Sequence, residues 1–135
     1  MVGIVVVTHG NMAHGILESM QMITGEQAQV VPIVLEEDKS PEDLSELIQH
    51  AIKEVDDGNG VLIMVDLFGA TPFNVSARLY LESDHSIEVI TGLNLPMLVE
   101  TVITRGENDL NTVFETAQNA GISGIKSIPD NLRKK

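Results

Sequence analysis

The sequence predicts one α/β domain built on an open, mostly parallel sheet with helices on both faces. Five short apolar runs rich in β-branched residues alternate with longer segments in which apolar residues recur at helical spacing. The resulting order, β-α-β-α-β-α-β-α-α-β, is typical of βαβ units that form a parallel sheet. The hydrophobic content of 43% and the charged content of 21% are ordinary for a globular protein of this length.

The first strand and helix are predicted at the N-terminus. Residues 2–7 are continuously apolar apart from Gly3, as expected for a strand covered on both faces. Asn11 is expected to cap the following helix and Gly25 to end it. The apolar stripe of this helix comprises Met12, Ile16, Leu17, Met20 and Ile23.

The second strand is predicted at residues 30–35, where Pro32 favours an edge position in the sheet. A strong helix start follows at Ser40, with Pro41 at the first helical position and acidic residues in the first turn. The expected buried stripe of this second helix comprises Leu44, Leu47, Ile48, Ala51, Ile52 and Val55.

The third strand, at residues 61–65, is the most apolar run and is therefore expected at the centre of the sheet. Thr71 and Pro72 are predicted to be the cap and the first residue of a third helix. A fourth strand is predicted at residues 86–91, and a fourth helix begins near residue 95.

The C-terminal part of the domain is predicted as one more helix and one more strand. Asp109 is expected to cap a fifth helix, which stops at Gly121. Residues 122–128 predict a short, weaker fifth strand. The predicted domain thus spans residues 1–128, and residues 129–135 form a polar C-terminal tail.

Strand burial predicts how these elements are arranged. The first and third strands are the most apolar, so both should be interior, and a flavodoxin-like order of 2-1-3-4 satisfies this condition. Ligands in open α/β sheets bind outside the carboxyl ends of the strands, where the winding reverses. In this order that crevice lies between Thr8-His9-Gly10 and Asp66-Leu67-Phe68-Gly69. The strand order therefore predicts that His9 and Asp66 lie side by side.

The predicted crevice suits phosphoryl transfer. A carboxylate beside a histidine fixes the ring tautomer and leaves the other nitrogen as a base, metal ligand or nucleophile. Helix N-termini near Asn11 and Thr71 would favour an anion at the same place. The hydroxyls of Thr8 and Thr71 could donate to phosphate oxygens, and Gly10 and Gly69 would allow close backbone approach. Phosphoryl transfer depends on such positioning and charge stabilisation.

Composition and missing motifs disfavour several other functions. The net charge of −12 opposes binding to nucleic acid and anionic lipid, and 3% aromatic content without Trp disfavours base stacking. The sequence has no cysteine and no HxxxH spacing, so no metal or other cofactor is expected. GxxxxGK[ST], GxGxxG and GxSxG motifs are also absent. No run approaches the ~18 apolar residues of a membrane span, so a cytoplasmic protein without membrane insertion is expected.

Three motifs resemble the mannose-class enzyme IIA domain of the bacterial sugar phosphotransferase system (PTS). They are Thr8-His9-Gly10 after a Val-rich strand, the segment Asp66-Leu67-Phe68-Gly69-Ala70-Thr71-Pro72-Phe73-Asn74, and the segment Gly92-Leu93-Asn94-Leu95-Pro96-Met97-Leu98. Relatives often have Trp in place of Phe68 and Ser in place of Thr71, so the aromatic and hydroxyl characters are kept. The resemblance covers nearly the whole chain, from Val2 to about Ile128.

The resemblance implies a phosphoryl carrier. His9 would be phosphorylated on Nε2 by the phosphohistidine of the carrier protein HPr, while Asp66 holds Nδ1–H. The phosphoryl group would then pass to an enzyme IIB partner and, through membrane components, to an incoming sugar. The residues expected around the phosphate are Thr8, Gly10, Asn11, Leu67, Phe68, Gly69 and Thr71.

The resemblance also implies a homodimer in which the last strand, expected to be antiparallel, is exchanged between subunits. Relatives are often fused to a IIB domain, whereas this chain stops at Lys135, so a free-standing IIA subunit is expected. Three alternatives remain open from the residues. They are the phosphotransfer subunit of a PTS-dependent dihydroxyacetone kinase, a flavodoxin-like module that binds a nucleotide or flavin, and a catalytically silent regulatory partner. Sugar specificity resides largely in the membrane components, so mannose, fructose, sorbose and amino sugars all remain candidates.

Overall fold

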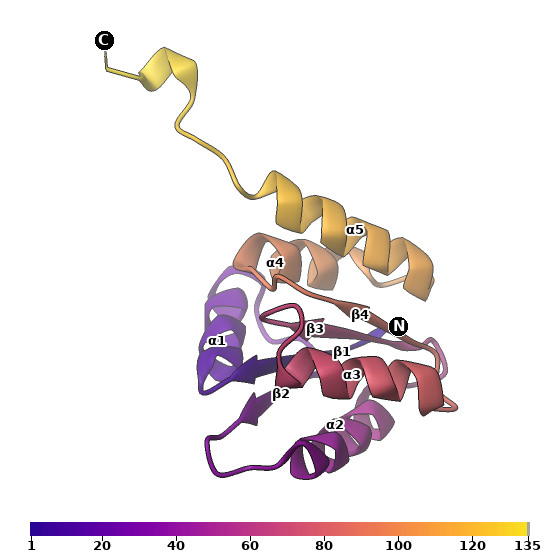
Figure 1. Ribbon diagram of the computed structural model, residues 1–135. Coiled ribbons are helices and arrows are strands. Elements are labelled where there is room, and N and C mark those ends of the chain that lie inside the picture. Colours follow the sequence, from indigo (N-terminus) through magenta and orange to yellow (C-terminus); the bar gives the residue numbers. More distant parts are fainter. Residues whose placement is uncertain (135) are drawn as a thin grey trace.

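A computed structural model describes residues 1–134, in which a four-stranded parallel sheet is flanked by five α-helices (Figure 1). The strands are β1 (Gly3–His9), β2 (Val30–Leu35), β3 (Val61–Val65) and β4 (Ile87–Ile90). The helices are α1 (Met12–Thr24), α2 (Pro41–Val55), α3 (Thr71–Glu82), α4 (Leu95–Thr104) and α5 (Leu110–Ser123), followed by a 3-10 turn, η1 (Asp130–Leu132).

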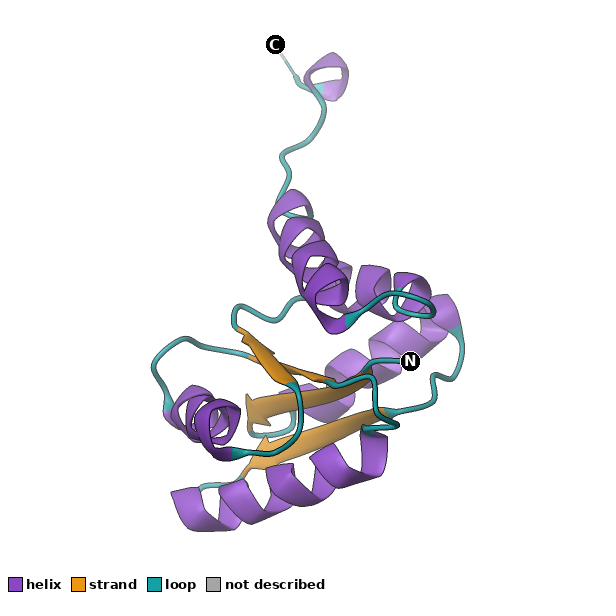
Figure 2. Ribbon diagram, turned by 90° about the vertical axis from the view of Figure 1, so that its right-hand side faces the viewer, coloured by secondary structure: helices purple, strands orange, loops and turns teal. Residues whose placement is uncertain are grey.

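The strand order is β2-β1-β3-β4, which confirms the predicted order 2-1-3-4 and the edge position of β2. Helices α1, α4 and α5 cover one face of the sheet, and α2 and α3 cover the other (Figures 1 and 2). The central strands are buried on both faces: Ile4 and Val6 of β1 face the first layer, and Val5 and Val7 face the second. This two-sided burial explains why β1 and β3 read as continuous apolar runs.

The start of β1 requires glycine because helix α2 passes very close to it. A Cβ at Gly3 would lie 2.5 Å from the carbonyl oxygen of Val55, the last residue of α2. Any larger residue would push the helix away from the sheet.

The described part of the chain contains no helix with the length and hydropathy of a membrane span.

Most predicted helix starts are confirmed, and one is shifted. Ser40 forms a full capping box with Asp43, and Asp109 accepts a hydrogen bond from the N–H of Thr112. The cap of α3, however, is Ala70 rather than Thr71, because Ala70 has an extended backbone and its carbonyl accepts the first helical hydrogen bond, from Asn74. Thr71 is therefore the first helical residue.

Three residues of the predicted apolar stripes are exposed. Met12, Ile23 and Leu47 are 45%, 61% and 45% accessible, respectively. They lie at the margins of the buried faces of α1 and α2, where spacing alone does not distinguish core from surface. The remaining stripe residues of α2 are buried.

The predicted fifth strand at residues 122–128 is not formed within the described single chain, residues 1–134. Ile122 and Ser123 complete α5 beyond the predicted stop at Gly121, and the segment that follows has no strand before η1. This segment, called here the tail (residues 124–134), projects away from the domain in both views (Figures 1 and 2). A strand needs a neighbouring strand, and the tail meets none within its own chain. Lys135 of the predicted polar tail lies outside the described residues.

A histidine–aspartate pair lies at the amino ends of β3 and β4. His85 Nδ1 lies 2.6 Å from Asp56 Oδ2, and the other carboxylate oxygen accepts from the N–H groups of Gly58 and Gly60. Burial opposes ionisation of Asp56, but the hydrogen bonds from His85, Gly58 and Gly60 outweigh it and lower the pKa of the carboxyl. The pair thus ties the loop after α2 to the loop after α3.

We expect Asp56→Asn to lower the free energy of unfolding by about 1.5–3 kcal/mol at neutral pH, the usual range for hydrogen bonds to a charged group. Because the folded-state pKa of Asp56 is lowered, its contribution is present above the unfolded-state pKa and is lost as the pH falls through the folded-state pKa. Urea unfolding at several pH values should therefore show the two proteins converging in acid. Asp84→Asn, which is exposed and lies beside His85 in the loop after α3, is the control; an equal loss there would contradict the assignment.

Candidate functional site

The first half of the site is the turn between β1 and α1. Thr8 is fully buried, and its Oγ1 accepts a hydrogen bond of 2.8 Å from the N–H of Ala13. Asn11 occupies the predicted cap position, but its side chain makes no capping hydrogen bond. Thr8 Oγ1 also donates to the carbonyl of Gly10 at 3.3 Å. The hydroxyl of Thr8 therefore caps α1 and shapes the turn. In the sequence, this role is indicated by the position of Thr8 just before the helix.

Gly10 makes the sharp turn possible. It has φ of +54°, a left-handed conformation that favours glycine, and its N–H donates to Leu35 of β2. His9 itself is still paired with Leu35 as the last residue of β1. The backbone of His9 is thus fixed by the sheet, while its side chain is 47% accessible.

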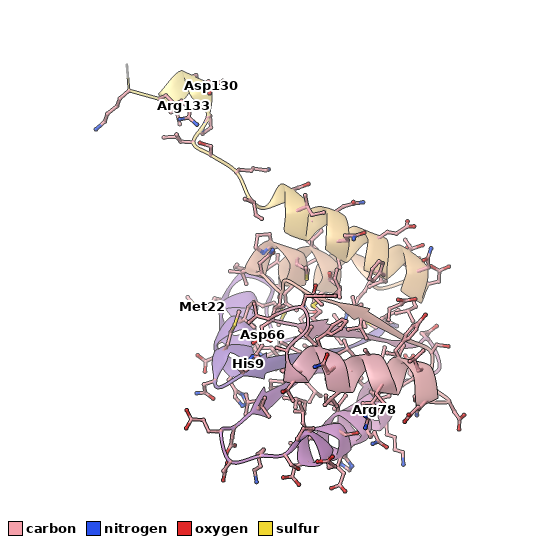
Figure 3. The ribbon with its side chains drawn as sticks, in the orientation of Figure 1. His9, Met22, Asp66, Arg78, Asp130 and Arg133 are labelled. Atoms are coloured by element: carbon pink, nitrogen blue, oxygen red, sulfur yellow. The ribbon has the colours of Figure 1, made fainter. Side chains whose placement is uncertain are left out.

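His9 and Asp66 form the predicted pair. His9 Nδ1 lies 2.8 Å from Asp66 Oδ2, and the backbone N–H of His9 donates to the same oxygen, also at 2.8 Å (Figure 3). The second carboxylate oxygen accepts from the N–H of Leu67 at 2.9 Å. An ionised carboxylate can only accept, so Nδ1 carries the proton and the lone pair lies on Nε2. No described residue hydrogen-bonds to Nε2.

The carboxyl of Asp66 is held in its ionised form. Its side chain is only 10% accessible, and burial opposes ionisation. The hydrogen bonds from the backbone and ring of His9 and from Leu67 outweigh that effect and lower the pKa of Asp66. At neutral pH the carboxylate is therefore available to stabilise positive charge that develops on the imidazole.

An open cleft of about 850 Å³ lies beside His9 and brings Gly10 and Thr71 to the same place. Thr71 begins α3, so the N-terminus of this helix reaches the cleft, and α1 begins three residues after His9. Unpaired N–H groups at such helix ends favour an anion. The cleft therefore combines a ring-nitrogen lone pair with an electropositive backbone.

The other wall of this cleft is acidic. It is formed by residues 35–39, which include Glu36, Glu37 and Asp38. We call these three side chains the acidic rim. From the sequence, residues 36–39 are only a polar loop, since charged loops are common surface connections. The acidic rim lies beside His9 because β2, which precedes this loop, pairs with β1.

The remaining predicted phosphate-site residues lie on the loop that follows Asp66. Leu67 and Phe68 are 60% and 78% accessible, and Gly69 has a left-handed φ of +82°. Phe68 packs on Phe73 with ring centroids 4.6 Å apart. Phe68 faces a different cavity from the one beside His9. Among residues 1–134, no three His, Asp or Glu side chains are grouped so that they could hold a metal ion.

The geometry agrees with the result of comparison with known proteins. Residues 3–118 match the EIIA-man family model, described as the PTS system fructose IIA component. The chain belongs to this family. It is therefore an EIIA component of a sugar phosphotransferase system, which confirms the resemblance drawn from the three motifs.

Relatives of this EIIA component are named for different sugars. The chain is 34% identical over 94% of its length to the mannose-specific EIIAB component of Escherichia coli K12, of which it spans only 39%. It is 30% identical to the fructose-specific EIIA component of Bacillus subtilis, covering 99% of this chain and 91% of the relative. A crystal structure of the phosphotransferase system component EIIA from Streptococcus agalactiae superposes with a TM-score of 0.87 at 36% identity, over 94% of this chain and 97% of that one.

We expect the ring ¹⁵N spectrum of His9 to show the tautomer with the proton on Nδ1, because Asp66 accepts from that nitrogen. Asp66→Ala should shift His9 toward the Nε2–H tautomer that predominates in free imidazole side chains. Asp56→Ala, which removes the carboxylate partner of His85, should leave the His9 signals unchanged. An Nε2–H signal for His9 in the unsubstituted protein would contradict the assigned geometry.

Proposed function

We propose that this EIIA component carries a phosphoryl group on His9 Nε2, accepting it from phosphorylated HPr and passing it to an enzyme IIB partner during sugar uptake. The observation that supports this most is the double anchoring of His9 to Asp66 through its backbone N–H and Nδ1. This anchoring leaves Nε2 free on a side chain that is almost half accessible.

The proposed step is an in-line displacement at phosphorus. The lone pair of His9 Nε2 forms the new N–P bond, and the N–P bond of the donor phosphohistidine breaks, returning its electron pair to the donor ring. The proton on Nδ1 of His9 stays in place, so the phosphorylated ring becomes cationic. The Asp66 carboxylate lies 2.8 Å from Nδ1 and stabilises that charge. In transfer to the IIB partner, His9 is the leaving group: the acceptor attacks phosphorus, the N–P bond to Nε2 breaks, and its electron pair returns to the His9 ring.

The helix ends and the acidic rim favour a phosphoryl group that arrives on a protein. The N-terminus of α3 at Thr71 favours the transferred group itself. Glu36, Glu37 and Asp38 repel free anions such as inorganic phosphate but attract a positively charged protein surface. A donor with basic residues around its phosphohistidine would satisfy both conditions.

We also propose that the protein is a homodimer in which residues 124–128 of each tail pair with β4 of the other subunit. Among residues 1–134, strand β4 pairs only with β3, so its outer edge has no neighbouring strand there. Ile125 and Ile128 of the tail are 82% and 54% accessible in the single chain, a large exposure for β-branched side chains. Pairing would give the peptide groups on the outer edge of β4 hydrogen-bond partners and would bury the side chains of Ile125 and Ile128.

A flavin-binding or nucleotide-binding role fits the site less well. Such rings stack on large aromatic side chains, and no described Phe or Tyr lines the cleft beside His9. The PTS-dependent dihydroxyacetone kinase subunit would use the same histidine chemistry. The two functions differ in the protein that accepts the phosphoryl group, because only a sugar PTS component would phosphorylate a IIB partner.

Incubation with enzyme I, HPr and phosphoenolpyruvate should add one acid-labile, base-stable phosphoryl group per chain. His9→Ala should abolish the label without unfolding the protein, because the side chain is exposed at the end of a strand. His85→Ala is the matched control, since His85 is also paired with an aspartate through Nδ1. Mass spectrometry that located the phosphate on His14 or His85, or found none, would overturn the proposal.

We expect Asp66→Asn to slow phosphoryl transfer by about 10- to 100-fold, by analogy with the cost of removing a carboxylate that orients a metal-binding histidine. Asparagine keeps an oxygen that can accept from His9 but cannot stabilise charge on the ring. Rapid-quench measurement of transfer from phosphorylated HPr, beside urea unfolding, separates the two effects. A transfer rate equal to that of the unsubstituted protein would remove Asp66 from the mechanism.

A further inference from the structure

A second cavity connects the active-site loop to the beginning of the tail. It measures about 430 Å³ and runs along the outer edge of the sheet. Phe68 and Phe73 lie at one end, Val89 and Ile90 of β4 lie along it, and α5 forms the opposite wall. Ile125, where the tail leaves the domain, also lines this cavity. We call it the β4 groove.

Phe68 is the part of the active-site loop that faces the β4 groove. It is two residues from Asp66, whose carboxylate holds His9. Its ring rests on Phe73, yet 78% of the residue is accessible. An aromatic side chain so exposed is held on one side only, and a further apolar contact would bury it and restrict the loop.

The tail of a second copy is the occupant that best fits the β4 groove. The tail is apolar on Ile125, Ile128 and Leu132, all accessible in the single chain. Residues 124–135 also carry four of the eight Lys and Arg residues and only one of the 20 acids. The basic segment is therefore complementary to the acidic domain from which it projects. The unpaired edge of β4 supplies backbone partners along the same groove.

We infer that the tail of the second copy covers Phe68 and thereby holds the loop of Asp66, so that each phosphoryl-transfer site is complete only in the dimer. This inference rests on the proposed exchange of tails between subunits and adds a consequence for the chemistry. Phe68 is a positioning residue, because it acts through Asp66 rather than on the phosphoryl group. Dimerisation and phosphoryl transfer are then coupled.

Ile128→Asp tests the coupling in the full chain. Ile128 is 54% accessible and does not line the β4 groove of its own chain, so the substitution leaves that lining unchanged. The control is Ile103→Asp on α4, which is 58% accessible and lies away from the groove. We expect Ile128→Asp to become monomeric in sedimentation at a concentration where Ile103→Asp remains dimeric. Its transfer rate per chain should fall about tenfold, within the usual range for coupled sites.

Phe68→Trp supplies a spectroscopic readout, because the natural sequence has no tryptophan. Its emission should be blue-shifted in the dimer and red-shifted after dilution or in combination with Ile128→Asp. The transfer rate per chain should decrease over the same dilution range. Phe68→Ala should slow transfer even in the dimer, and Phe68→Trp should slow it less than Phe68→Ala, because it keeps an aromatic contact.

The possible failures are distinguishable. A monomeric Ile128→Asp with undiminished transfer would overturn the coupling and leave the exchanged dimer and the phosphoryl carrier intact. If both Ile128→Asp and the double variant Ile125→Asp, Ile128→Asp stayed dimeric, the tail would not be the dimer contact and the inference would fall. Absence of a phosphoryl label on His9 in the unsubstituted protein would instead remove the proposed function itself.

Discussion

The parallel pairing of β1 with β3 is the constraint on which the site depends. The register places Val7 beside Val65, so the next residues along each strand leave the sheet at the same edge. His9 and Asp66 come from segments 57 residues apart, yet two contacts of 2.8 Å join them. Because both strands are buried on both faces, neither can slip without exposing its core residues. The geometry of the pair is thus supported by the whole hydrophobic core.

The chain contains two histidine–aspartate pairs, and their surroundings differ. His9 lies at the carboxyl ends of the strands, where α1 and α3 begin; His85 lies at the amino ends, after α2 and α3 have ended. Helix N-termini attract an anion and helix C-termini repel one. Under the proposed function, the same pair of side chains would therefore receive a phosphoryl group at one edge of the sheet, whereas at the other edge it joins two loops. The position in the fold, rather than the pair itself, determines the chemistry.

Much of this arrangement could be predicted from the sequence, because it follows from burial. Two continuously apolar strands had to be central, and that placement brought His9 beside Asp66. Features that depend on contacts between distant segments could not be predicted. Arg105 is fully buried and donates to the carbonyls of Val2, Ala28 and Gln29, but nothing in its local pattern indicates this. The fifth strand depends on such contacts too, since residues 124–128 have no neighbouring strand within residues 1–134.

The surface around His9 suits a carrier that must release what it receives. The phosphoryl group would be held by backbone N–H groups and one ring nitrogen, with no described Lys or Arg lining the cleft except Lys39. A site richer in cations would stabilise the phosphorylated state and slow onward transfer. The acidic rim acts in the same direction, because it raises the energy of an anion left in the cleft without its basic partner. In the proposed mechanism, stabilisation of the transferring group would therefore come largely from the partner protein, and transfer would proceed when the two surfaces are in contact.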